Sequence, residues 1–91
     1  MEKAQIELCG WKEVDITSQR PPYEDIEQVF KLHKWDLYVH QEGLISIFKY
    51  KALRGYTDDR LCCRFMGYIT TPQELKILMS QLGMDYLTKT L

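Results

Sequence analysis

The alternation of apolar and polar residues through the middle of the chain constrains the fold most. In the stretch Trp35–His40 every second residue is apolar, and a period of two is typical of a strand with one buried face. The stretches Leu44–Ala52 and Arg60–Ile69 are rich in β-branched and aromatic residues, which favour strands. Three consecutive strands with short connections predict an antiparallel meander.

The segment Gln41–Gly43 between the first two strands has the length of a three-residue hairpin loop. Its final glycine fits, because such a loop needs a positive φ at its last position. This loop sets the register and places Val39 opposite Ile45 and Leu37 opposite Ile47. A shift of one residue would turn every side chain to the other face, so the register decides which residues form the core.

Two helices are predicted, one on each side of this meander in sequence. The first covers Pro22–Lys34, because proline suits an opening turn and acidic residues follow it. The second begins at a capping box, Thr71–Glu74, in which the threonine side chain accepts from the third helical N–H and the glutamate reaches back to the threonine N–H. It ends before Gly83, a common helix stop. The apolar face of the first helix would contain Ile26, Val29, Phe30 and His33.

The N-terminal segment precedes the strongest break in the chain, Gln19–Pro22. Ala4, Ile6 and Leu8 alternate with polar residues, which predicts a strand, and Trp11–Thr17 is a second candidate strand. These strands would extend the meander to four or five. The C-terminal residues 84–91 fit either a returning strand or a frayed tail.

The predicted fold is therefore a single α+β domain over residues 1–91, because a chain of this length holds one main hydrophobic core. It has two layers, the order (β)-α-β-β-β-α, and both helices packed on one face of the meander. The layer beneath the helices would contain Leu37, Val39, Ile45, Ile47, Leu61, Cys63, Phe65 and Ile69.

Composition and charge exclude several classes of protein. A net charge of −1 argues against a surface that is one continuous phosphate-binding field. No apolar run approaches the ~20 residues that span a bilayer, so we expect no membrane partner. The three cysteines have no disulfide-framework spacing and no secretory signal precedes them, so we expect a reduced, cytoplasmic protein.

The other face of the meander combines aromatic, methionine and arginine side chains. An uncovered apolar patch generally has a partner, and Tyr, Met and Arg are enriched at the centres of protein interfaces. Three interpretations stay open: the chain's own N-terminal segment or C-terminal tail covers this face, a protein partner binds it, or single-stranded nucleic acid stacks on it. The predicted binding residues are Tyr38, His40, Phe48, Arg60, Arg64, Met66 and Tyr68.

We therefore expect a small non-enzymatic interaction or regulatory protein, an adaptor or inhibitor, that binds a protein partner or a second copy of itself. The alternative is a single-stranded RNA- or DNA-binding module that uses the same face. Its phosphate contacts would come from the basic stretch of Lys49, Lys51 and Arg54, extending to Arg60.

No catalytic residue, metal site or cofactor is predicted. The glycines are scattered singly and form no phosphate-binding loop. The adjacent Cys62 and Cys63 would point to opposite faces of a strand and are poorly placed to chelate one ion together. The two histidines, His33 and His40, have no accompanying nucleophile motif.

Overall fold

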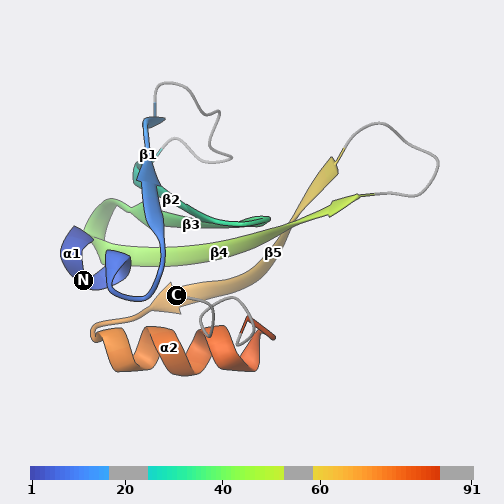
Figure 1. The fold of residues 1–91 in the computed structure, drawn as a ribbon. Coiled ribbons are helices and arrows are strands. Elements are labelled where there is room, and N and C mark those ends of the chain that lie inside the picture. The colour runs from blue at the N-terminus through green and yellow to red at the C-terminus, as the bar shows by residue number, and fades with distance from the viewer. Residues whose placement is uncertain (17–24, 53–58, 85–91) are drawn as a thin grey trace.

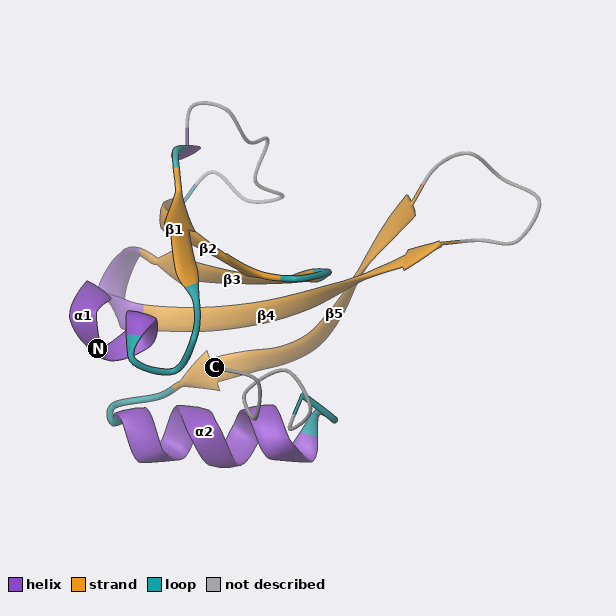
Figure 2. Ribbon diagram, viewed as in Figure 1, coloured by secondary structure: helices purple, strands orange, loops and turns teal. Residues whose placement is uncertain are grey.

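The computed structural model describes residues 1–16, 25–52 and 59–84, with the backbone alone for 50–52 and 59–61 (Figure 1). Its sheet has five strands in the order β1-β2-β3-β4-β5, and every neighbouring pair is antiparallel. Two α-helices accompany the sheet (Figure 2). The predicted α+β meander with two helices is therefore confirmed. The elements are α1 (Lys3–Glu7), β1 (Lys12–Val14), β2 (Ile26–Leu32), β3 (Trp35–His40), η2 (Gln41–Gly43), β4 (Leu44–Ala52), β5 (Asp59–Tyr68) and α2 (Pro72–Gln81).

The central hairpin of β3 and β4 has the predicted bounds, loop and register. Val39 pairs with Ile45 and Leu37 with Ile47. Gly43 in the connecting turn has φ 86°, which is the left-handed conformation that glycine adopts without steric cost. The turn therefore fixes which face of both strands is buried beneath the helices.

The predicted helix over Pro22–Lys34 is wrong, because its described part contains the strand β2. The register of β2 shifts between Ile26 and Gln28, where a bulge is inserted. Such a bulge puts an extra residue into one strand, so Ile26 and Val29 bury on one face while Phe30 buries on the other. A bulged strand buried on both faces therefore reproduces the i, i+3, i+4 spacing of a helix.

The predicted strand at the N-terminus is also wrong, because residues 3–7 form the short helix α1. The N–H of Glu2 donates to Oε1 of Gln5 at 2.9 Å, which satisfies a donor at the helix start. Lys3 Nζ lies 3.1 Å from Glu13 and 3.7 Å from Glu7, and its hydrogen bond and charge contact with Glu13 raise the pKa of Lys3. Only Ile6 of this helix is buried. The second candidate strand is present as β1.

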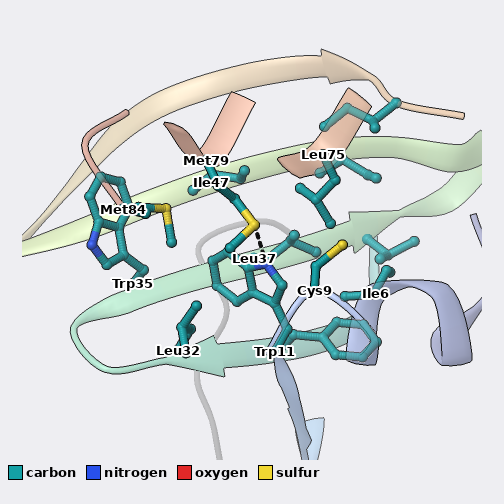
Figure 3. Packing of buried hydrophobic residues seen from close by; sticks show 14 residues of the cluster. Ile6, Cys9, Trp11, Leu32, Trp35, Leu37, Ile47, Leu75, Met79 and Met84 are labelled. Atoms are coloured by element: carbon teal, nitrogen blue, oxygen red, sulfur yellow. Dashed lines mark hydrogen bonds between the residues drawn. The ribbon is translucent and has the colours of Figure 1, made fainter. Parts of the chain in front are cut away.

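Both helices bury side chains in one cluster on one face of the sheet (Figure 3). This is the predicted two-layer arrangement, with α1 in place of the predicted helix over Pro22–Lys34. Ile6 comes from α1, Leu75 and Met79 come from α2, and Leu37 and Ile47 come from the central hairpin. The indole N–H of Trp11 donates to Sδ of Met79 at 3.4 Å inside this cluster. Met84 is fully buried there, so the chain beyond α2 starts by packing against the core.

The register of β5 also contains a bulge, and it corrects the predicted positions of two cysteines. Ile47 pairs with Phe65, whereas the next residue, Phe48, pairs with Cys63, so Arg64 is the extra residue. Cys63 is therefore exposed rather than part of the core beneath the helices. Cys62 pairs with Lys49, so Cys62 lies on the opposite face of the sheet from the one predicted for it.

Candidate functional site

The face predicted to be open is divided into a buried part and an exposed part. Tyr38, His40 and Phe48 are only 3%, 2% and 5% exposed, whereas Met66 and Tyr68 are 48% and 65% exposed. Arg64 is exposed as well. We refer to Arg64, Met66 and Tyr68 as the β5 surface. Of the other predicted residues, Arg60 and Lys51 pair through their backbones and Arg54 lies outside the described residues.

Side chains of the chain's own strands cover Tyr38 and Phe48. The two rings meet edge to face, with centroids 5.3 Å apart, and Ile26 and Val29 of β2 complete the cluster. Val14, from the N-terminal segment, is half-buried against it. The interpretation in which the N-terminal segment covers this face therefore applies to the half formed by β3 and β4.

A buried polar group lies beside this second cluster. The Tyr38 hydroxyl donates to Oδ2 of Asp36 at 2.9 Å, and Asp36 is buried. Lys31 Nζ lies 3.9 Å from Oδ1 of Asp36. The phenol therefore has a structural partner inside the protein, which explains how a tyrosine is accommodated in an apolar cluster.

The other polar group is a hydrogen-bonded chain of Asp25, His40 and Ser46. Nδ1 of His40 lies 3.1 Å from both carboxylate oxygens of Asp25, and Nε2 lies 2.7 Å from Oγ of Ser46. A carboxylate accepts only, so Nδ1 carries the proton and donates to Asp25. The order carboxylate, imidazole, hydroxyl has the connectivity of a nucleophilic triad.

The Ser46 hydroxyl is buried at the inner end of this hydrogen-bonded chain. Ser46 is 0% exposed, so a substrate cannot reach its hydroxyl in this conformation. Asp25 and His40 instead line a pocket of about 230 Å³, together with Leu44 and Met66. The Asp25 side chain is 49% exposed at this pocket. The arrangement therefore suits a binding pocket in which Ser46 fixes the orientation of the histidine.

The pocket adjoins the β5 surface through shared residues and pairing. Met66 belongs to both, and it pairs with Ser46. Leu44, which lines the pocket, pairs with Tyr68. Side chains of directly paired residues lie on the same face of a sheet. The pocket and the exposed Tyr68 therefore form one continuous candidate site.

Our reasoning from the sequence missed Asp25, Leu44 and Ser46. The predicted register already places Ser46 opposite Tyr38, so a small polar residue could have been located on this face. Asp25 could not have been placed, because the predicted helix assigned it to a first turn. Its actual position depends on a backbone contact, the Gln41 N–H donating to the Asp25 carbonyl at 2.9 Å.

The basic stretch is only partly described. Lys49 Nζ lies 5.2 Å above the centre of the Trp35 ring, which is a cation–π geometry. Base stacking requires exposed rings, and of Tyr38, Phe48 and Tyr68 only Tyr68 is exposed. The rings of Tyr38 and Phe48 are therefore not accessible to stacked bases in this structure.

Among the described residues, no group of three His, Cys, Asp or Glu side chains lies close enough to hold a metal ion. Within the same residues, no helix is long and apolar enough to cross a membrane. Comparisons with protein-family models, with curated proteins and with solved structures found no match to this chain.

Proposed function

We propose that this protein is a non-enzymatic binding module that recognises a protein partner through the β5 surface. The observation that carries the proposal is the exposure of Met66 and Tyr68, two large apolar side chains separated by one residue on a strand at the edge of the sheet. Methionine, tyrosine and arginine are enriched at interface centres, and Arg64 lies on the same strand. A regulatory role as an adaptor or inhibitor in the cytoplasm is consistent with this proposal.

The exposed side chains on the helices provide matched controls. Leu8, at the end of α1, is 75% exposed, and Ile77 on α2 is 59% exposed, close to the 65% of Tyr68. Neither residue belongs to the pocket. Replacing either of these side chains by glutamate adds the same negative charge at an exposed position and leaves the β5 surface unchanged.

The test is affinity capture from a lysate of the cells in which the protein naturally occurs, followed by mass spectrometry. The wild type is compared with four variants: Met66→Glu, Tyr68→Glu, Leu8→Glu and Ile77→Glu. We expect a protein that the wild type and both helix variants capture and that both β5 variants lose. Capture that is equal for all four variants, or lost equally by all, would contradict the proposal. Circular dichroism of each variant checks that the fold is retained.

Two further measurements distinguish other occupants of the same surface. Light scattering during size-exclusion chromatography would show about twice 10.9 kDa if the partner is a second copy, and Tyr68→Glu would restore the monomer. Fluorescence anisotropy with short RNA and DNA strands tests the nucleic-acid alternative. Binding that weakens steeply with salt and is unaffected by Met66→Glu would support that alternative instead.

A further inference from the structure

We infer that the pocket of Asp25, His40, Leu44 and Met66 accepts a basic side chain, lysine or arginine, from the protein partner. This inference rests on the proposed function, because the pocket shares Met66 with the β5 surface. Three features of the pocket support it: an available carboxylate, its fixed orientation, and apolar walls.

The carboxylate of Asp25 has capacity for a cationic donor. An ionised carboxylate offers about four lone-pair positions on its two oxygens, and the single Nδ1–H of His40, 3.1 Å from each oxygen, leaves most of them available. Among the described residues, no lysine or arginine forms an ion pair with Asp25. Its side chain is 49% exposed, so a donor from another molecule can approach it.

The orientation of Asp25 is fixed before any ligand arrives. The ring of His40 is 2% exposed and is held at its other nitrogen by Ser46, 2.7 Å away. The backbone of Asp25 is also held, since its carbonyl accepts from the Gln41 N–H at 2.9 Å. A group that is already positioned loses little conformational freedom on binding, which favours affinity.

The two apolar residues among the described lining of the pocket match the stem of a long basic side chain. Leu44 and Met66 are apolar, and the methylene groups of lysine and arginine pack against apolar surface while the charged end reaches a polar group. The thioether of methionine is unbranched and adapts to the shape of its ligand. A volume of about 230 Å³ accommodates one such side chain but not a folded segment.

The test is a titration of ¹⁵N-labelled protein with n-propylguanidinium, followed by NMR, with n-propylurea as the uncharged probe of the same shape. We expect saturable shifts of the Asp25, Leu44 and Met66 amide signals with n-propylguanidinium and none with n-propylurea. A single contact of this kind corresponds to dissociation constants of about 1 mM or weaker. Shifts that are equal for both probes, or absent, would overturn the inference.

The variant Asp25→Asn removes the charge and keeps an oxygen that accepts from His40. We expect it to weaken n-propylguanidinium binding about tenfold, as loss of a charge-assisted hydrogen bond does. Glu27→Gln is the matched control, because it removes an exposed carboxylate from β2 outside the pocket. Equal weakening by both variants would show a general charge effect and contradict the inference.

The two proposals fail in different ways. If β5 variants lose the partner but Asp25→Asn binds n-propylguanidinium as well as the wild type does, the protein interface stands and the basic-side-chain pocket is wrong. If the titration succeeds while Met66→Glu and Tyr68→Glu still capture every partner, the pocket binds cations but the proposed interface is wrong.

Discussion

Ser46 is fully buried in β4, although serine side chains usually lie at protein surfaces. Its hydroxyl lies 2.7 Å from Nε2 of His40. We expect Ser46→Ala to lower the free energy of unfolding by about 1–3 kcal/mol, because Nε2 is left buried without this partner. Urea unfolding followed by circular dichroism measures the change. Ser80→Ala, at an exposed position of α2, is the control, and an equal loss in both variants would contradict the structural role of Ser46.

The three cysteines are predicted to differ in reactivity. Cys9 is 3% exposed, and burial raises the pKa of its thiol, so less of it is thiolate at any given pH below that pKa. Cys63 is exposed and Cys62 is half-buried. We expect iodoacetamide to modify Cys63 first and Cys9 last, as peptide mass spectrometry would show. If iodoacetamide modified Cys9 as fast as Cys63 in the folded protein, the burial of Cys9 would be refuted.

The raised pKa of Cys9 also has a defined effect on stability. The folded protein holds the thiol proton more tightly than the unfolded chain does. The protonated, buried thiol therefore contributes to the free energy of unfolding in full below the ordinary thiol pKa of 9.0. That contribution is lost as pH rises through the raised pKa of the folded protein. A Cys9→Ser variant should show a weaker loss of stability with alkaline pH than the wild type. An identical alkaline profile in both proteins would contradict this assignment.

At the scale of elements, the start of α2 tests how far a local signal determines structure. Thr71 Oγ1 accepts from the Glu74 N–H at 3.2 Å, as the capping box predicted, whereas the Glu74 carboxylate accepts from the Thr70 hydroxyl at 3.0 Å. We expect Thr71→Ala to cost about 1 kcal/mol of stability and Thr71→Ser to cost much less, because serine also caps. Thermal unfolding of the two variants provides the comparison. Equal costs would show that the cap contributes nothing.

Elements determined by local chemistry could be predicted from the sequence, and those determined by bulges could not. The turn at Gly43 and the helix after Thr71 depend on a few neighbouring residues, and both were predicted correctly. β2 and the register of β5 depend on extra residues, at Glu27 and at Arg64, that break the period of two. A strict period of two cannot place such a bulge, because the extra residue shifts the alternation that follows it.

The elements that the sequence did not predict also restricted how much of the candidate site could be predicted. Met66 and Tyr68 were placed on an accessible face, because they pair with residues of the correctly predicted hairpin. The burial of Tyr38 and Phe48 was one of three interpretations left open. The sequence could not select it, since the burial depends on β1 and β2, one of which was predicted to be a helix. The position of Asp25 in the site could not be predicted either, because Asp25 directly precedes β2, which was predicted to be part of a helix.

At the scale of the whole molecule, one sheet separates two apolar clusters. Both tryptophans, Trp11 and Trp35, are buried in the cluster beneath the helices, whereas Phe48 belongs to the cluster on the opposite face. We expect Phe48→Ala to lower stability by about 3–5 kcal/mol and to shift the tryptophan fluorescence transition by the same amount as the circular dichroism transition. A tryptophan transition that stays unchanged would show that the two clusters unfold independently.

The central claim is that the β5 surface carries the function, and a ratio of dissociation constants tests it most directly. A protein captured by the wild type is purified and titrated by calorimetry with Tyr68→Glu and with Ile77→Glu. These variants make the same kind of change at positions that are 65% and 59% exposed. We predict that Tyr68→Glu weakens binding at least about tenfold, as substitution of an interface anchor does, and that Ile77→Glu leaves it within about twofold. Equal dissociation constants for the two variants would contradict the claim.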